Sequence, residues 1–392
     1  MRGCERMSIL RANFRILWLG CLCLFTFPLS AQDVSKATYI RMQWENDLLK
    51  IRLNDVTDRF YTNGLQLDVF TPIFSKIPSR FLLIKLGASS QHMYGLSIGQ
   101  EIYTPTDLTT DSILRGDRPY AGWFHFSHRL ISNDPLRQQR LSTQIQVGFM
   151  GRWSLASELQ RGIHRLFKNS LPQGWRNQIA NDIGLSYYAK YEKRFFRRIH
   201  EKLDIIQHFE GQVSTVSNFI GLGSRFRLGR FNDYFQNPMG LSEKRIEPKL
   251  RQALIEQQAQ LLGIADLPEK AQKKWINLSD PDVARDSLQQ MILEEAKRKT
   301  NKKFQLYYVM EPSFRLAFNN ALMQGGIFGK DNSPHTLSAD KLRRYYFNLE
   351  FGIVIGIRGL EVSFSQFFRS KEFDAGESQR WGRVRLTIGL ND

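Results

Sequence analysis

Hydrophobic and polar side chains alternate along most of the chain with the two-residue period of β-strands. In residues 40–45, for example, Ile, Met and Trp alternate with Arg, Gln and Glu. Because successive side chains of a strand point to opposite faces, each such segment has one apolar and one polar face. The pattern predicts twelve strands, at roughly 38–50, 61–72, 91–103, 119–131, 139–150, 178–193, 203–219, 223–233, 304–318, 343–356, 359–370 and 379–390.

Two architectures give this alternation. A water-soluble sandwich would turn its apolar faces inward, whereas a membrane barrel turns them to lipid around a polar lumen. Strands of roughly ten residues, aromatic residues at strand ends and polar faces that mix Arg, Glu and Asp with Gly and Ser favour the barrel. We therefore predict an all-β chain that forms a twelve-stranded antiparallel transmembrane β-barrel.

The first residues have the composition of an export signal. An apolar run at 16–27 is shorter than the ~20 residues that a membrane-spanning helix needs, and small residues at 29–31 suit cleavage. We expect residues 1–31 to be a secretory signal peptide and 32–392 the barrel chain. Cys21 leaves a lipoprotein signal as an alternative. The signal holds every cysteine of the chain and the basic residues Arg2, Arg6, Arg11 and Arg15.

An even number of strands returns both chain ends to the periplasm. Residues 51–60, 104–118, 151–177 and 319–342 then lie at the outer mouth. The third of these loops has helical spacing over Ser154–Lys168, with Ser154 as a plausible cap. Residues 241–303, rich in Gln, Lys, Glu, Leu and Ala, predict a helical periplasmic insertion. It is either a solvated insertion without chemistry or a segment that docks a periplasmic partner or the inner leaflet.

The formal net charge of +17 favours anionic partners. Export argues against nucleic acid, so anionic lipid or a phosphorylated glycolipid is the better match.

Candidate chemistry falls at the predicted outer mouth. His164 lies on the predicted helix, and Gln160 lies four residues earlier on the same face. A neutral imidazole can take a proton from water, although a lone helical histidine is more often structural. Asn46 and Asp47 end the first strand, where a carboxylate beside an amide suits a hard cation such as calcium. A strand-end turn explains the pair equally well.

Two further positions line the same region. Thr62 shares strand parity with Gln66 and Asp68, which predicts that its hydroxyl points into the lumen near the first strand's end. A turn at Asn-Gly is the simpler interpretation. Arg118 can clamp a phosphate through two hydrogen bonds or pair with its neighbour Asp117. The chain has no Gly-x-Ser-x-Gly elbow between a strand and a helix, since Gly95-Leu96-Ser97-Ile98-Gly99 lies inside the strand predicted at 91–103, and it has no His-Glu-x-x-His or phosphate-loop motif.

Together these motifs resemble the outer-membrane lipid A deacylase family. The resemblance covers nearly all of the chain after the signal except 241–303. It rests on the shared order and spacing of Asn46-Asp47, Tyr61-Thr62-Asn63-Gly64, Tyr103-Thr104-Pro105, Arg118-Pro119-Tyr120-Ala121-Gly122, Gln160-x-x-x-His164, Gly174-Trp175-x-x-Gln178, Asn181-Asp182 and residues 316–322.

The resemblance implies a twelve-stranded barrel and Ca²⁺-dependent hydrolysis of the 3′-acyloxyacyl ester of lipid A. His164 would be the general base, Asn46 and Thr62 would help build the active site, and Asn46 with Asp47 would hold calcium. The substrate, a lipopolysaccharide component, would lie in the outer leaflet of the outer membrane of a Gram-negative bacterium. Its phosphates would meet Arg115 and Arg118, and Gln160 would contact it.

The chain departs from the family in one candidate position. The family's characterised member uses a lysine in the loop after Tyr103-Thr104-Pro105, whereas residues 106–118 contain only Arg115 and Arg118 as cations. Either an arginine replaces this lysine as the partner of the oxyanion or of a phosphate, or the activity differs. The alternative functions are a non-catalytic barrel, as a narrow channel or a docking protein, and a deacylase-like barrel without activity.

Overall fold

The computed structural model describes residues 33–35, 37–51, 59–87, 90–135, 137–196, 202–235, 238–239 and 302–390. The unit that spans 34–392 contains the whole barrel. The predicted signal peptide lies outside the described residues, and so does the predicted insertion 241–303 apart from Lys302 and Lys303.

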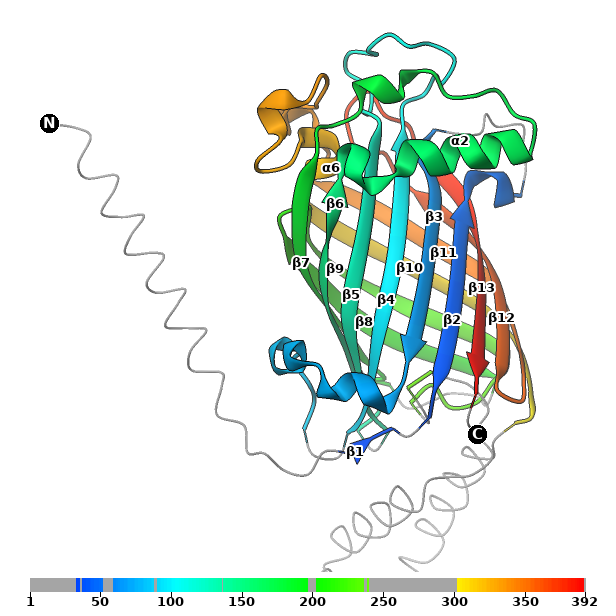
Figure 1. Ribbon diagram of the computed structural model, residues 1–392. Helices are drawn as coiled ribbons and strands as arrows, with labels where there is room; N and C mark the ends of the chain where they lie inside the picture. Colours follow the sequence, from blue (N-terminus) through cyan, green and yellow to red (C-terminus); the bar gives the residue numbers. More distant parts are fainter. Residues whose placement is uncertain are drawn as a thin grey trace, which may run out of the picture. The chain divides into compact units, whose positions relative to one another are not determined.

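Twelve antiparallel strands form a closed barrel, which confirms the predicted fold (Figure 1). Each strand pairs with its neighbour in sequence, and β2 pairs with β13 to close the cylinder. A two-residue strand, β1 (Asp33–Val34), precedes them in sequence. The barrel strands are β2 (Tyr39–Asn46), β3 (Phe60–Phe70), β4 (Gln91–Thr104), β5 (Ala121–Asp134), β6 (Gln139–Met150), β7 (Asp182–Lys193), β8 (Leu203–Ser214), β9 (Ser217–Arg230), β10 (Phe304–Asn320), β11 (Tyr345–Ile357), β12 (Leu360–Arg369) and β13 (Gln379–Gly389).

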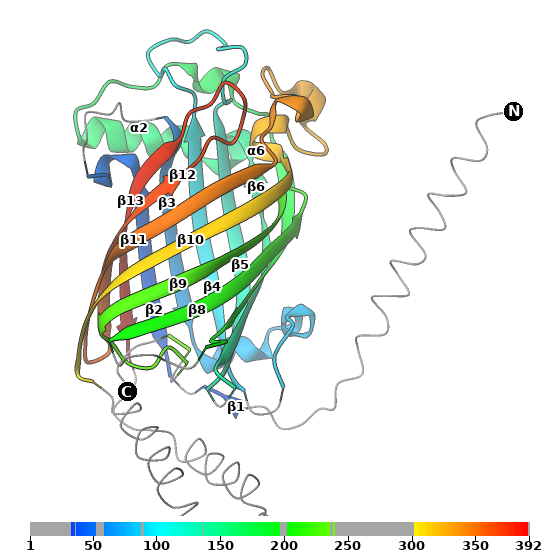
Figure 2. The ribbon, with the colours of Figure 1, turned by 180° about the vertical axis from the view of Figure 1, so that it is seen from behind.

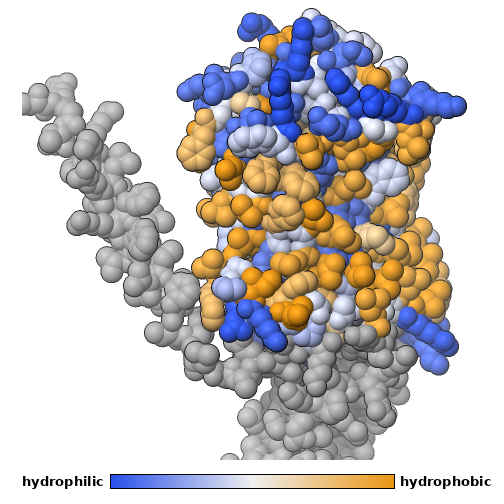
Figure 3. Space-filling view, viewed as in Figure 1, coloured by the Kyte–Doolittle hydropathy of each residue, from blue (hydrophilic) through white to orange (hydrophobic). Residues whose placement is uncertain are grey.

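The alternation of the strands separates an apolar outer wall from a polar lumen. Figure 3 shows a broad hydrophobic band over the strands, with hydrophilic surface above it. Large apolar side chains are exposed on this wall, among them Leu67, Phe126, Val147, Leu222 and Phe351. The lumen holds a cavity of about 490 Å³ lined mainly by charged and amide side chains. This arrangement is that of a membrane barrel rather than of a soluble sandwich.

The helices gather at one end of the barrel, apart from a pair of 3₁₀ turns at the other (Figure 1). The first residue of β2 pairs with the last of β13 at the end away from α2, which is the periplasmic end of such barrels. At the outer end lie η1 (Asp47–Leu49), η4 (Gly151–Ser154), α2 (Ala156–Leu166), η5 (Gly174–Asn177), α6 (Ala321–Gln324), η7 (Lys330–Asn332) and η8 (Ala339–Lys341), and at the periplasmic end η2 (Pro72–Lys76) and η3 (Pro78–Leu82).

Several predicted boundaries differ from those of the structure, and the first strand, for example, ends at Asn46 rather than at 50. β8 ends at Ser214 and β9 begins at Ser217, because local hydrogen bonds turn the chain there: the Val216 amide donates to the Ser214 hydroxyl and the Ser214 amide to Asn218. β7 begins at Asp182 rather than 178 because η5 precedes it. The helix begins at Ala156, and its N-cap is Leu155 in a left-handed conformation (φ 55°). The helices of the described ranges are too short or too polar to span a lipid bilayer.

Candidate active site

Helix α2 lies against the outer face of β4 and β5 at the outer end of the barrel (Figure 1). Its buried side chains recur every four residues, at Ala156, Gln160 and His164, so one helical face meets the wall. Gly122 of β5 allows this close approach, because a Cβ at that position would collide with the Ser154 hydroxyl and the Ala156 methyl group. The packing therefore fixes where the candidate base lies.

His164 is 3% exposed, and the turn after the helix fixes its ring. Lys168 adopts a left-handed conformation (φ 56°), and the Asn169 amide donates to the His164 carbonyl at 2.8 Å. The chain then turns back, so that the Ser170 carbonyl oxygen lies 2.6 Å from His164 Nδ1. Since a carbonyl only accepts, Nδ1 must carry a proton. In the neutral ring Nε2 is then the basic atom.

Gln160 lies one helical turn before His164, and Trp175 holds its side chain in place. The Trp175 indole donates to Gln160 Oε1 at 2.7 Å. Trp175 itself is 2% exposed and packs against the Tyr120 ring with centroids 4.9 Å apart. With its oxygen engaged, Gln160 presents its amide nitrogen as a buried donor that has no hydrogen-bond partner within the described part of the chain. Buried donors without partners are rare, so a ligand group is a natural acceptor.

Asn46 ends β2 and caps the short helix η1. Its Oδ1 accepts from the Leu48 amide at 2.8 Å, and its Nδ2 donates to Asn63 Oδ1 at 3.1 Å. This side chain therefore shapes the turn that carries Asp47. Asp47 is 3% exposed and borders a cavity of about 170 Å³ that is also lined by Lys50, Arg59, Phe60, Glu377, Ser378, Gln379 and Arg380.

A hard cation beside Asp47 would need oxygen ligands from other kinds of group besides carboxylates. No group of three or more His, Cys, Asp or Glu side chains is placed to hold a metal ion among the residues that the structure describes. Calcium takes six to eight oxygens, including amide, hydroxyl and backbone oxygens and water. Asp47, Ser378 and Gln379 offer such atoms around one cavity, which the cations Lys50, Arg59 and Arg380 also line. The calcium site at Asp47 stays a prediction.

The prediction that Thr62 points into the lumen is wrong. The pairing of β3 with β4 shifts between Tyr61 and Asn63, which leaves Thr62 as the extra residue of a β-bulge. Tyr61 takes the lumen-facing position, while the Thr62 hydroxyl lies 2.7 Å from that of Thr104. A bulge reverses the parity that a regular strand would give, so Thr62 leaves the lumen lining.

The Arg118 guanidinium pairs with Glu372 and not with Asp117, which accepts only from the Arg118 backbone amide. Its predicted contact with a phosphate stays a prediction. Arg118 is 1% exposed, its Nη1 donates to Glu372 at 2.9 Å, and its guanidinium lies 4.1 Å from the centre of the Tyr103 ring. Burial raises the pKa of Glu372, but the Arg369 and Arg118 charges outweigh it and hold that pKa below its ordinary value. The ion pair between Arg118 and Glu372 joins the loop before β5 to the loop after β12 at the outer mouth. Arg115, by contrast, is exposed on the outer loop.

Several residues of this region were not predicted from the sequence as functional side chains. The Ser170 carbonyl has no sequence signal, because any residue supplies a backbone oxygen. Asn63 was visible only as part of the Asn-Gly turn, and Trp175 only as a motif residue without a role. Glu372 lies 254 positions from Arg118, so nothing local could connect them.

Figures 1 and 2 both place α2 and η1, which carry His164 and Asp47, at the outer end of the barrel. Fold and site together define an outer-membrane β-barrel whose polar candidate residues lie at the outer mouth. The model of the family described as outer membrane protein LpxR matches residues 17–390. The chain belongs to this family, which places it in the outer membrane of a Gram-negative bacterium and confirms the predicted family resemblance.

Comparison with one solved structure supports the barrel fold. LpxR from Salmonella typhimurium superposes with a TM-score of 0.60 at 15% identity, over 89% of this chain and 99% of that one. The β domain of the Bordetella autotransporter Brka is less similar, with a TM-score of 0.42 and 7% identity over 90% of this chain and 99% of that one. A search of curated protein sequences found no match.

Proposed function

We propose that this protein hydrolyses the 3′-linked acyloxyacyl ester of lipid A in the outer leaflet. The observation that carries the proposal is the helix α2, which buries His164 and Gln160 against the outer wall of an LpxR-family barrel. A site on the outside of the wall, at the outer end, suits a lipid substrate whose acyl chains run along the apolar strands.

His164 would act as the general base. Its Nδ1 donates to the Ser170 carbonyl, so Nε2 would take a proton from water as the water oxygen attacks the ester carbonyl carbon. The tetrahedral intermediate then collapses, the bond between the carbonyl carbon and the sugar oxygen breaks, and the imidazolium returns the proton to that oxygen. The products are a free acyloxy fatty acid and a sugar hydroxyl.

Gln160 would donate to the substrate oxygen that becomes negative. Its Nε2 is buried and lacks a partner within the described ranges, while Trp175 fixes the side chain through Oε1. A pre-positioned donor of this kind costs no reorganisation during the reaction.

Asp47 would hold a calcium ion at the outer mouth, with Asn46 shaping the turn that presents it. When bound, the ion would supply positive charge for the developing oxyanion. Thr62 would support this region through its pair with Thr104, and the exposed Arg115 would meet a lipid A phosphate.

Mass spectrometry of lipid A tests the proposal. Detergent-solubilised protein would be incubated with lipid A in calcium and, separately, in a calcium chelator. We expect loss of one 3′-linked acyloxyacyl mass in calcium only. Unchanged lipid A in both samples, from protein with the heat-modifiable migration of a folded barrel, would favour a barrel without this activity. Cleavage in both samples would support the hydrolase function and would show that the reaction does not need calcium.

A further inference from the structure

The connection between β3 and β4 forms an amphipathic ledge at the periplasmic end of the outer wall. We use the term periplasmic ledge for residues 72–86, which comprise η2, η3 and the chain that follows them. Figures 1 and 2 show these residues at the end of the barrel away from α2. They run along the wall instead of turning directly from one strand into the next.

Contacts with successive strands hold the ledge in place. The Ser79 hydroxyl lies 2.7 Å from His128 of β5, and the Thr143 hydroxyl of β6 donates to the Ile84 carbonyl at 3.0 Å. The Ile84 amide donates to the Tyr187 hydroxyl of β7 at 3.1 Å. Leu83 is 3% exposed and packs in a cluster with Tyr94, Leu130, Phe74 and Ile145. The ledge is therefore a fixed part of the wall.

The ledge nevertheless exposes its largest apolar side chains. Ile73, Phe81, Leu82 and Ile84 are each about 60% exposed. Four such side chains on one short segment would be costly in water. They continue the lipid-facing surface of strands β4 to β7, on which the ledge packs, so acyl chains are their natural surroundings.

The polar side chains of the ledge are cationic. Lys76, Arg80 and Lys85 lie among the apolar residues, and the sequence has no acidic residue between Asp68 and Glu101. Arg80 donates to the Ser75 carbonyl at 2.8 Å and lies 4.6 Å from the Phe81 ring centre. Burial lowers the pKa of Lys85, and the Arg80 charge lowers it further. Like charges are thus held close together on a fixed support.

We propose that the periplasmic ledge binds the phosphate headgroup of anionic phospholipid in the inner leaflet of the outer membrane. Lys76, Arg80 and Lys85 would contact the phosphate, while Phe81, Leu82 and Ile84 lie along the acyl chains. A segment of this kind lies in the interface plane, where basic side chains and apolar area act together. The protein would then contact a different lipid in each leaflet.

Native mass spectrometry of the full exported chain in detergent tests this directly. The probes are phosphatidylglycerol and phosphatidylcholine with identical acyl chains. We expect tighter binding of phosphatidylglycerol, by at least ten-fold, since each cation near a lipid surface contributes about five-fold. The variant Lys76→Gln/Arg80→Gln/Lys85→Gln should lose most of this preference. Equal binding of the two lipids by the native chain would overturn the proposal.

A matched variant separates the ledge from basic residues at the outer end. Arg152→Gln/Lys330→Gln/Lys341→Gln also removes three exposed cations and should keep the full preference. An equal loss in this variant would show that the lipid does not bind at the ledge. Should the first triple variant fail to fold, Lys76→Gln/Lys85→Gln keeps the Arg80 contacts. It should still lower the preference at least five-fold, and an unchanged preference would contradict the site.

Discussion

The hydrogen bond between His164 and the Ser170 carbonyl decides which ring nitrogen can accept a proton. A carbonyl partner fixes the proton on Nδ1 and so assigns the base to Nε2. One turn earlier, the Trp175 indole decides in the same way which end of the Gln160 amide is presented. Both assignments depend on residues that reach the helix from the loop after it, which is why the sequence could suggest the two polar residues but not their supports.

Trp175 is a positioning residue for Gln160, and Trp175→Phe removes its hydrogen bond. Because such a bond contributes about 0.5–1.5 kcal/mol, we expect kcat for lipid A to fall between about two-fold and ten-fold with little change in KM. Trp381→Phe is the matched control, since that indole is equally buried and donates to Glu45 in the lumen. A similar fall in kcat for both variants would indicate a general loss of structure.

The stability of the outer mouth depends on pH through Glu372. Its folded pKa lies below the ordinary value of 4.5, so its ion pairs stabilise the mouth above that value and are lost as pH falls through the folded pKa. We expect Glu372→Gln to weaken hydrogen-exchange protection around Arg118 at neutral pH, by about 3–5 kcal/mol, and to remove its acid dependence. Glu377→Gln, which breaks an exposed pair with Arg59, should change neither.

At the scale of elements, the two-residue period was enough to predict all twelve strands. The bulge at Thr62 could not be predicted, because it depends on how β3 pairs with β4 and not on β3 alone. For the same reason the helix was predicted but its contact with β4 and β5 was not. Which residues act in catalysis stays a prediction.

The contact between α2 and the wall can be broken at one position. Gly122→Val would place side-chain atoms where Ser154 and Ala156 now lie, so we expect α2 to be displaced and deacylation to be lost while the barrel still folds. Gly162→Ala lies on α2 with nothing within 4 Å of the added methyl group. This control should keep full activity. Full activity in Gly122→Val, with a folded barrel, would mean that docking of α2 is not needed.

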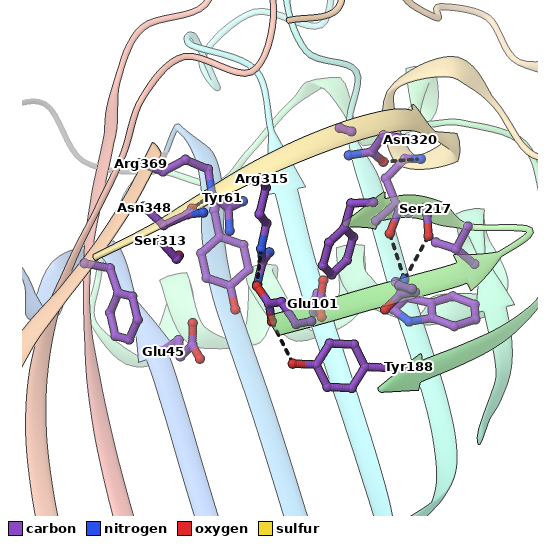
Figure 4. Close-up of a pocket in the computed structure, with 18 of the residues that line it drawn as sticks. Glu45, Tyr61, Glu101, Tyr188, Ser217, Ser313, Arg315, Asn320, Asn348 and Arg369 are labelled. Carbon is purple, nitrogen blue, oxygen red and sulfur yellow. Dashed lines mark hydrogen bonds and ion pairs between the residues drawn. The ribbon is translucent and has the colours of Figure 1, made fainter. Parts of the chain in front are cut away.

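At the scale of the whole molecule, charged side chains cross the lumen. Arg129 of β5 reaches Asp68 of β3 at 2.8 Å, and Lys190 of β7 reaches Glu311 of β10 at 2.7 Å. Figure 4 shows Arg315 and Tyr188 converging inside the lumen, where both bind Glu210. Except for the bond between Tyr188 of β7 and Glu210 of β8, these contacts join strands that are not neighbours, so side chains brace the interior.

A braced lumen predicts a barrel that does not conduct. In planar lipid bilayers we expect the native protein to insert without resolved single-channel steps. The variant Lys190→Ala/Glu311→Ala, which removes one crossing pair, should raise the conductance. Stable, frequent steps from the native protein would contradict this account and support the channel alternative.

The central claim is that a histidine on the outer wall activates water against a lipid A ester. The most direct test compares lipid A by mass spectrometry after incubation in calcium with the native protein, His164→Ala and His125→Ala. His125 is the matched control, since it is also 3% exposed but lines the lumen. We predict that the 3′-linked acyl mass is lost with the native protein and with His125→Ala, and that it remains with His164→Ala. Cleavage by a folded His164→Ala variant at the native rate would contradict the account.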